Sequence, residues 1–487
     1  MRNGITAPAA RVQATPRFSI AAHPPMPSPS IPATDDSVAS VVSTLKAHAP
    51  TVRRTTAAQR SAKLRRLADG LLARRDTFVE ALHADFRKAP VEVDLTELKA
   101  VTKEIEHAVA HLEEWMRPDR TASPLLFTGT RSEVHYEPKG VVLIMSPWNY
   151  PVNLTLGPLV GAIAAGNCAV LKPSEHAPHT AAALEALIGD LFDDREITVR
   201  TGGPDVAEAL TAQPFDHIYF TGSPAIGRRV MRAAAEHLTS VTLELGGKSP
   251  AVVDATADLE QAAGRIAWSK FTNAGQTCIA PDYVLVENRV HDALVDHLHA
   301  TIERFYGPTP ETQRQSDDYA RLVHEDHYDA VVGLLTEALE AGATAAVGGE
   351  HDADTRYVAP TVLTDVPPGT RILQEEIFGP LLPIRSYSTL DEAVAFINER
   401  PAPLSLYLFT ERDATVDQLL AETTAGSTCI NEGFVHFVNP ALPFGGTGES
   451  GMGRGHGVHS FRAFSNERSV LRRDYVSDLL RPLYPPY

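Results

Sequence analysis

The chain has 487 residues, of which 43% are hydrophobic and 22% charged, an ordinary balance for a globular protein with a sizeable core. This length exceeds the size at which single cores stop growing, so we expect two or three domains. The formal net charge of −17 argues against a nucleic-acid partner, because phosphate contacts need clustered Lys and Arg. No apolar run of about 18 residues is present, which argues against a membrane partner.

The cysteines and the N-terminal composition indicate the setting of the protein. Cys168, Cys278 and Cys429 are too few and too scattered for a disulfide framework. They fit a reducing compartment, so we expect a cytoplasmic location. Residues 1–35 are rich in Pro, Ala and Ser and contain no acidic residue before Asp35. This composition predicts a disordered N-terminal tail.

Hydrophobic periodicity predicts the elements that follow. Apolar residues at three- and four-residue steps predict helices over 37–48, 57–84 and 91–116. From residue 134 strand-like and helical segments alternate. The strands are expected at 140–145, 169–172, 217–221 and 241–245, and the helices at 156–165, 180–191 and 226–237. Such alternation predicts an open parallel α/β sheet, whose ligands bind beyond the carboxyl ends of the strands.

A second alternating region follows Glu244. Its expected helices are 259–268, 290–305 and 328–341, and its expected strands are 283–286, 359–364 and 404–409. No repeat of fixed period is present, which argues against a solenoid. The fold class is therefore α/β, with more than one sheet.

Several motifs resemble known sites without the context that those sites need. Residues 446–451 spell G-x-G-x-x-G, yet they neither follow a strand nor open a helix, so we predict a loop. Gly247-Lys248-Ser249 lacks the first glycine of a phosphate-binding loop, because Thr242 stands there. The histidine pairs at 324/327 and 456/459 lack further ligands, so we predict solvated histidines and no metal site.

Two strand ends carry groups suited to a dinucleotide. Gly222 and Ser223 follow the strand 217–221 and open a helix, where free N–H groups suit a pyrophosphate. Lys172 ends the strand 169–172, and Glu175 lies three residues later. The pair can hold a ribose, although taken alone it also fits a solvated Lys–Glu pair.

Three residues offer the chemistry of covalent catalysis. Cys278 lies in a small polar loop, where we expect backbone dipoles to lower the pKa of its thiol, although free cysteines are more often buried and inert. Glu244 ends an apolar run, where desolvation raises the pKa of a carboxyl towards that of a useful base, unless it faces water. Asn149, between Trp148 and Tyr150, can donate to an oxyanion or cap a helix.

These residues carry a resemblance to the aldehyde dehydrogenase superfamily over about residues 36–487. The matching motifs are Pro147-Trp148-Asn149, Lys172-Pro173-Ser174-Glu175, Phe220-Thr221-Gly222-Ser223, Glu244-Leu245-Gly246-Gly247-Lys248, Gly275-Gln276-Thr277-Cys278 and Glu375-Glu376-Ile377-Phe378-Gly379-Pro380. Residues 278–283, 443–446, 459–461 and 484–486 resemble the class 3 and bacterial coniferyl aldehyde dehydrogenase branch. Glu432 and Glu449 depart from it, since Asp and Asn are expected there.

The resemblance implies a Rossmann-like cofactor domain, an α/β catalytic domain and a small bridging element for oligomerisation. Residues 36–118 and 140–243 would bind NAD or NADP, residues 244–447 would carry catalysis, and residues 119–139 and 448–487 would form the bridge of a homodimer. The implied activity is oxidation of an aromatic or medium-chain aldehyde to the acid, through a thiohemiacetal and a thioester.

The resemblance also implies a role for each matching residue. Cys278 would be the nucleophile, Asn149 the oxyanion donor and Glu244 the base. The residues expected to hold the cofactor are Lys172, Ser174, Glu175, Gly222, Ser223, Glu376 and Phe378.

Two rival functions remain at this point. A thioesterase or acyltransferase would use Cys278 without a cofactor and would leave Glu376, Phe378 and Gly222 without a role; a CoA-acylating dehydrogenase is a closer variant. A binding protein that has kept the fold would not need Cys278, Glu244 and Asn149 together. Turnover with and without cofactor distinguishes these cases.

Overall fold

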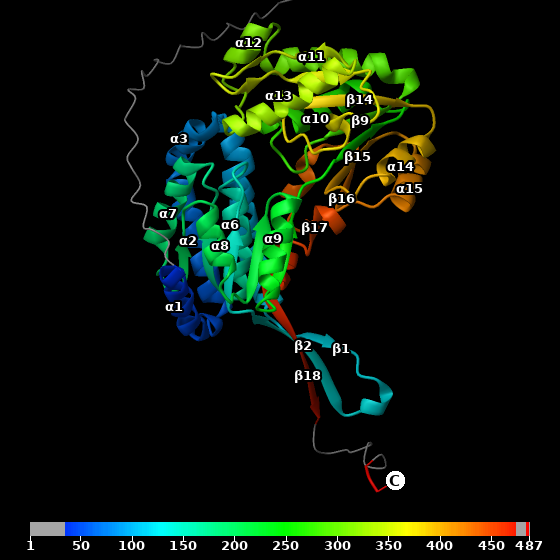
Figure 1. Cartoon of the computed structure of the whole chain (residues 1–487). Helices are drawn as coiled ribbons and strands as arrows, with labels where there is room; N and C mark the ends of the chain where they lie inside the picture. Colours follow the sequence, from blue (N-terminus) through cyan, green and yellow to red (C-terminus); the bar gives the residue numbers. More distant parts are fainter. Residues whose placement is uncertain (1–34, 474–483, 487) are drawn as a thin grey trace, which may run out of the picture. The chain divides into compact units, whose positions relative to one another are not determined.

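Two large sheets organise the residues that the computed structural model describes, which are 35–473 and 484–486 (Figure 1). The tail predicted over 1–35 lies outside the described residues except for Asp35, which begins α1 (Asp35–Arg53). Among the described residues, no helix combines the length and the hydropathy that a membrane crossing requires.

The first sheet has six strands in the order β17-β7-β6-β3-β4-β5. Their bounds are β3 Val141–Met145, β4 Cys168–Lys172, β5 Ile197–Val199, β6 His217–Thr221, β7 Ser240–Glu244 and β17 Gly451–Met452. All neighbours are parallel except β17, which runs antiparallel to β7. The four strands predicted in this region are therefore confirmed, whereas β5 and β17 were not predicted.

Helices cover both faces of this sheet, which explains the continuous apolar runs of its strands. Val142 and Ile144 contact one group of helices, whereas Val141 and Leu143 contact the other, because successive side chains alternate between the faces. The first group is α2 (Ala57–Ala73), α3 (Arg75–Phe86), α5 (Lys99–Trp115), α6 (Asn153–Ala165) and α7 (Pro178–Leu191). The second is α1, α8 (Pro204–Thr211) and α9 (Pro224–Ala235).

The second sheet has seven strands in the order β10-β13-β14-β9-β8-β15-β16, all parallel except β10. Their bounds are β8 Pro250–Val253, β9 Tyr283–Glu287, β10 Thr344–Val347, β13 Thr361–Thr364, β14 Leu381–Tyr387, β15 Ser405–Phe409 and β16 Ser427–Ile430. One core contains α10 (Leu259–Phe271), α11 (His291–Tyr306) and α13 (Glu325–Glu340), and another contains α14 (Leu390–Asn398) and α15 (Asp413–Glu422).

A third sheet joins distant parts of the chain. It consists of β1 (Asp119–Thr121), β2 (Thr130–Pro138) and β18 (Ser465–Arg473), in the order β1-β2-β18. β18 pairs with β2 antiparallel over its whole length, from Ser465 opposite Pro138 to Arg473 opposite Thr130. The sequence predicted a bridging element here but no strands.

Two of the predicted helices are divided. The segment predicted as one helix over 57–84 breaks at Arg74, whose φ of −108° and ψ of 18° leave the helical region. The segment predicted over 91–116 begins as α4 (Pro90–Glu92), widens to a π-helix over Val93–Leu98 and only then becomes α5. Neither change has a local Pro signal inside the helix, and π-turns occur often at functional sites.

Shorter elements complete the fold. They are α12 (Pro310–Gln315), α16 (Gly457–Ala463), the strand pair β11 (His351–Asp352) and β12 (Tyr357–Val358), and 3₁₀ turns at Leu125–Phe127, Thr272–Gly275, Asn288–Val290, Arg371–Leu373, Phe434–Val438 and Gly448–Ser450.

Candidate active site

The predicted site residues follow the carboxyl ends of neighbouring strands. Lys172 is the last residue of β4, Gly222 follows β6, and Glu244 is the last residue of β7. Asn149 lies in the loop after β3, and β3 lies between β4 and β6 in the sheet. Because these strands are parallel, the four positions share one edge of the sheet. Cys278 comes from elsewhere, between α10 and β9.

The loop before Cys278 has an unusual backbone. Asn273 and Ala274 have φ angles of 54° and 51°, and Gly275 has a φ of 77°. A Cβ on Gly275 would lie 2.3 Å from the carbonyl oxygen of Gly379, so only glycine fits. Left-handed non-glycine residues each cost on the order of 1–3 kcal/mol, which the surrounding contacts must offset.

Hydrogen bonds hold this strained loop. Glu92 accepts from the Asn273 backbone N–H at 3.2 Å, and Gln276 Nε2 donates to Asn273 O at 2.9 Å. The Gln276 side chain also accepts from the Val323 N–H at 3.0 Å. The contacts with Glu92 and Val323 join the loop to two distant segments, so the position of Cys278 is set by tertiary structure.

Asn149 is tied to the same loop and is 2% exposed. Its Nδ2 donates to Gln276 O at 2.9 Å, and its Oδ1 has no hydrogen-bond partner among the described residues. The next residue, Tyr150, shares a hydrogen bond of 2.6 Å with Thr277. The side chain of Asn149 does not cap α6, which excludes the second of its predicted roles. One N–H of its amide is left for an oxyanion.

The thiol of Cys278 is half-buried. Burial raises its pKa to about 12, and the charges of Glu376 and Glu244 act in the same direction. The expectation that backbone dipoles lower the pKa is therefore wrong, because desolvation and the two carboxylates outweigh them. A base must therefore take the proton as the sulfur attacks.

Glu244 has the properties of such a base. It is 5% exposed, and burial raises the pKa of its carboxyl to about 8, although the hydrogen bond from Tyr219 partly lowers it. This confirms the predicted direction of the shift and excludes a strand-end carboxylate that faces water. A carboxyl with a pKa near neutral can accept a proton and return it.

A single pocket brings the two groups together. It encloses about 900 Å³, including space open to solvent, and both Cys278 and Glu244 line it. Its remaining wall is mostly apolar and contains aromatic rings. The aromatic residues are Tyr150, Tyr219, Phe434, Phe437 and Phe444. Such a pocket suits an apolar ligand that reaches the thiol at one end.

Glu376 and Phe378 lie beside this site on the loop before β14. A Cβ on Gly246 would come within 2.3 Å of both carboxylate oxygens of Glu376, which also accepts from the Gly247 N–H at 3.1 Å. Burial raises the pKa of Glu376 to about 8, with Asp282 acting in the same direction. Phe378 has a φ of 50° and packs edge-on against Trp148, with ring centroids 5.4 Å apart.

Two of the predicted cofactor residues, Lys172 at the end of β4 and Glu175 after it, form an ion pair. Lys172 Nζ lies 2.7 Å from Glu175 Oε2, and Lys172 is 4% exposed, whereas Glu175 reaches the surface. Burial alone would raise the pKa of Glu175, but the hydrogen bond from Lys172 brings it below the usual value. Ser174 is buried, and its Oγ accepts from the His176 N–H at 3.2 Å.

Gly222 and Ser223 form the N-terminus of α9. Ser223 is the N-cap residue, whose Oγ accepts from the Ile226 N–H at 3.4 Å, and Pro224 occupies the first helical position. Ser223 and Ile226 are exposed. An open helix N-terminus at the sheet edge suits a pyrophosphate, so the residues present fit a dinucleotide.

Some of the motifs that were set aside contribute to the site. Residues 446–451 are not a cofactor turn, as predicted, but they form a 3₁₀ turn and then β17, which pairs with Glu244. His327 was predicted to be solvated, yet its Nε2 lies 2.9 Å from Phe378 O. His456 was also predicted to be solvated, but it lines the pocket. No cluster of His, Cys, Asp or Glu suited to a metal occurs among the described residues.

The two departures from the class 3 pattern have partners. Glu432 lies 3.4 Å from Arg265, and Glu449 lies 2.8 Å from Arg228. Both are surface ion pairs, which contribute little to stability.

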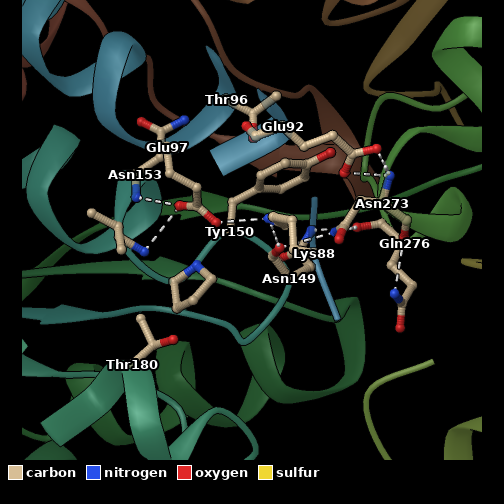
Figure 2. A network of polar contacts seen from close by, with 12 residues as sticks. Lys88, Glu92, Thr96, Glu97, Asn149, Tyr150, Asn153, Thr180, Asn273 and Gln276 are labelled. Atoms are coloured by element: carbon tan, nitrogen blue, oxygen red, sulfur yellow. Dashed lines mark hydrogen bonds and ion pairs between the residues drawn. The ribbon is translucent and has the colours of Figure 1, made fainter. Parts of the chain in front are cut away.

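Sequence reasoning missed Tyr219, Lys88 and Glu97. Tyr219 binds Glu244, while Lys88 and Glu97 form a buried ion pair beside Asn149 (Figure 2). One sequence signal could have identified Tyr219. It stands two residues before the end of the predicted strand 217–221, and the next predicted strand carries Glu244. The charged pair had none, because Lys and Glu side chains normally face water.

Comparison with known proteins gives consistent matches. The aldehyde dehydrogenase family model matches residues 30–470. Aldehyde dehydrogenase family 3 member B2 of Mus musculus is 44% identical over 429 residues, 88% of each chain. The dimeric NADP-preferring aldehyde dehydrogenase of the same species is 44% identical over 408 residues, 84% of this chain and 88% of that protein.

A solved structure is similar over nearly the same length. The substrate-bound state of the Staphylococcus aureus protein AldH superimposes with a TM-score of 0.86 and 42% identity. The match covers 90% of this chain and 94% of that one.

Proposed function

This chain belongs to the aldehyde dehydrogenase family and oxidises aldehydes to acids with NAD or NADP, and on that premise we propose that Cys278 is the nucleophile, Glu244 the base and Asn149 the oxyanion donor. One observation carries the assignment. Cys278 and Glu244 line one pocket, and Asn149 is hydrogen-bonded to Gln276, two residues before Cys278.

Glu244 prepares the thiol for attack. With the pKa of the thiol at about 12 and that of Glu244 at about 8, the thiol proton passes to the carboxylate only as the sulfur bonds to the carbonyl carbon. The oxygen of the resulting thiohemiacetal bears negative charge. The free N–H of the Asn149 amide and the backbone N–H of Cys278 stabilise that charge.

The same carboxyl serves the second half of the reaction. After oxidation the acyl group is held on Cys278 as a thioester. The proton that Glu244 took from the thiol is released to solvent before this step. Glu244 then takes a proton from water, the hydroxide adds to the thioester carbon, and the C–S bond breaks to give the acid and a thiolate, which receives its proton from Glu244. The apolar wall of the pocket favours an aromatic or medium-chain aldehyde as substrate.

The cofactor would be held along the sheet edge. Lys172, Ser174 and Glu175 are placed to hold the adenosine ribose, and Gly222 and Ser223 the pyrophosphate at the N-terminus of α9. When bound, NAD or NADP supplies the hydride acceptor. Glu376 and Phe378 lie beside the part of the site that contains Cys278, and they would orient the nicotinamide ring of the cofactor.

We assign cofactor binding to residues 36–118 and 140–243, catalysis to 244–447, and bridging to 119–139 and 448–487. The separate six- and seven-stranded sheets support the first two. The exposed sheet β1-β2-β18 supports the third, because its two edge strands can pair with another chain. A homodimer is expected, and sedimentation equilibrium checks it. Three free cysteines favour the cytoplasm, which cell fractionation checks.

The assay compares the wild type with two cysteine variants. Purified protein with benzaldehyde or hexanal and either cofactor should give reduced cofactor. Cys278→Ala should abolish this turnover, whereas Cys429→Ala, a buried thiol on β16, should retain it. If Cys278→Ala still oxidises the aldehyde, the assignment of Cys278 as the nucleophile is wrong. Product formation that requires CoA would favour the acylating variant of the family.

A further inference from the structure

A fully buried ion pair lies behind the loop that carries Asn149 (Figure 2). Lys88 Nζ is 2.7 Å from Glu97 Oε1, and both side chains are 0% exposed. Burying two charges costs several kcal/mol per ion even after relaxation, and such a pair is weak evidence for a gain in stability. Its location therefore calls for another explanation.

Both members of the pair bind the segment from Asn149 to Asn153. Lys88 Nζ donates to Asn149 O at 2.9 Å. Glu97 Oε2 accepts from the N–H groups of Val152 and Asn153 at 3.1 and 2.9 Å. α6 has no side-chain cap from its own N-cap residue, so Glu97 supplies the acceptor that this helix end needs.

The carbonyl that Lys88 binds is also part of the cysteine loop. Asn273 Nδ2 donates to Asn149 O at 2.9 Å, while Asn149 Nδ2 donates to Gln276 O at 2.9 Å. The main chain and the side chain of Asn149 are thus fixed in one network. Lys88 supplies the charged contact of that network, and its Nζ also lies 4.1 Å from the centre of the Tyr150 ring.

Neither charged group reaches the chemistry itself. Among the described residues that line the pocket, neither Lys88 nor Glu97 occurs. Glu97 binds the first turn of α6 and not the end of β4 or β6. The contact that joins the pair to a group of the proposed reaction is the one between Lys88 and Asn149.

We propose that Lys88 is a positioning residue, which together with Glu97 aims the side-chain amide of Asn149 at the oxyanion formed on Cys278. The inference rests on the proposed function of this site. Lys88 Nζ and Asn273 Nδ2 both donate to Asn149 O. These two hydrogen bonds hold the peptide group of Asn149, so its side-chain amide cannot rotate together with the main chain. Removing the ammonium leaves the amide in place but free to turn away from the developing charge.

A double-mutant cycle tests the coupling. Lys88→Met should lower kcat for benzaldehyde about 100-fold, as expected when one oxyanion donor is lost. In an Asn149→Ala background the same change should cost less than about threefold, because the group that Lys88 positions is absent. The dissociation constant of NAD should stay within about twofold. Equal losses in both backgrounds would overturn the proposal.

A second comparison separates positioning from folding. Lys88→Met alone leaves Glu97 charged, buried and unpaired, so it lowers Tm. Lys88→Met/Glu97→Gln removes both charges and keeps an acceptor for Val152 and Asn153. Its Tm should recover towards that of the wild type while kcat remains low. If kcat recovers together with Tm, the pair is structural only and the proposal fails.

A matched control uses a different ion pair on the same domain. Lys63 on α2 pairs with Glu196 next to β5, and neither residue contacts Asn149. Lys63→Met should retain kcat within about twofold. A loss as large as that of Lys88→Met would overturn the claim that the effect is specific to Asn149.

Ester hydrolysis distinguishes the failure of this inference from the failure of the proposed function. Hydrolysis of 4-nitrophenyl acetate needs the thiol and the oxyanion donor but no hydride transfer. If the wild type oxidises no aldehyde yet hydrolyses the ester, the redox assignment falls, and the same cycle on ester turnover decides the role of Lys88. If aldehyde oxidation proceeds and the cycle is additive, only the inference about Lys88 falls.

Discussion

The hydroxyl of Tyr219 donates to Glu244 Oε1 across adjacent strands, with the two oxygens 3.3 Å apart. Glu244 Oε2 has no hydrogen-bond partner among the described residues. One oxygen is therefore held while the other remains available to a proton. Since the hydrogen bond favours the charged form, Tyr219 partly offsets the increase in pKa that burial causes.

This relationship predicts the pH dependence of turnover. The wild-type kcat should rise with pH through about 8, as Glu244 loses its proton and becomes a base. Tyr219→Phe removes a contact that lowers the pKa of Glu244, so the midpoint of the profile should move to higher pH. Glu244→Gln should lower kcat by on the order of 10²–10⁴. Stopped-flow kinetics between pH 6 and pH 10 measure both effects; a midpoint that moves downward in Tyr219→Phe contradicts the assignment.

The carboxylates near Cys278 should control its reactivity. In the free enzyme a thiol pKa of about 12 predicts slow alkylation by iodoacetamide, with a rate that rises up to high pH. Glu376→Gln removes one of the charges that raise this pKa, so alkylation should accelerate. The acceleration should be largest above about pH 8, where Glu376 is ionised. Mass spectrometry of the labelled peptide, with Cys278→Ala as the blank, measures the rate; an unchanged rate at pH 9 speaks against the coupling.

The ion pair at the end of β4 should set the cofactor preference. Glu175 places a negative charge 2.7 Å from Lys172, where a 2′-phosphate would compete with it. Glu175→Gln removes that charge and frees the ammonium, so the ratio of kcat/KM for NADP to that for NAD should rise about tenfold, equivalent to about 1.4 kcal/mol. Glu185→Gln, on α7, is a charge-matched control that should leave the ratio unchanged. A ratio that falls in Glu175→Gln would show that this carboxylate does not face the ribose.

Buried Glu104 should make stability depend on pH. Burial raises its pKa to about 7 in the folded state, compared with about 4.3 in an unfolded chain. Between these values the folded state binds more protons, so its contribution to stability is present at low pH and is lost as pH rises through about 7. Glu104→Gln keeps an acceptor for the Gly457 N–H and does not titrate.

The variant should therefore gain stability relative to the wild type as pH rises from about 4.5 to about 7, by about 3 kcal/mol, with no further gain above pH 7. Chemical denaturation at a series of pH values gives this difference, and the nearby His456 is common to both proteins. A gain that grows as pH falls would be the opposite sign and would exclude a raised pKa for Glu104.

The sequence predicted the strands that precede Gly222 and carry Glu244 and Lys172, because these residues lie at the ends of apolar runs. β6 was expected at 217–221 and spans those residues, and Glu244 and Lys172 end their strands as the apolar runs indicated. Apolar runs bounded by Gly or Pro are local signals that survive in the folded protein.

The tertiary network around Asn149 was beyond such reasoning. Glu97 stands in a predicted helix, where periodicity places charged residues towards water, and Lys88 lies in the short connection before that helix. Their burial depends on Asn149 O and on the first turn of α6, which are more than 50 residues away in the sequence. The lowered pKa predicted for Cys278 failed for a related reason, because the pKa is raised first by burial in the folded protein and then by Glu376, from a loop almost 100 residues further on.

The last strand of the first sheet gives Glu244 its environment. β17 pairs with β7 at Glu244, and a Cβ at Gly445 would lie 3.1 Å from Glu244 Oε1. Residues 445–455 thus help to exclude water from the carboxyl of Glu244, and this burial raises its pKa to about 8. The strength of the base therefore depends on a segment that lies about 200 residues further along the chain.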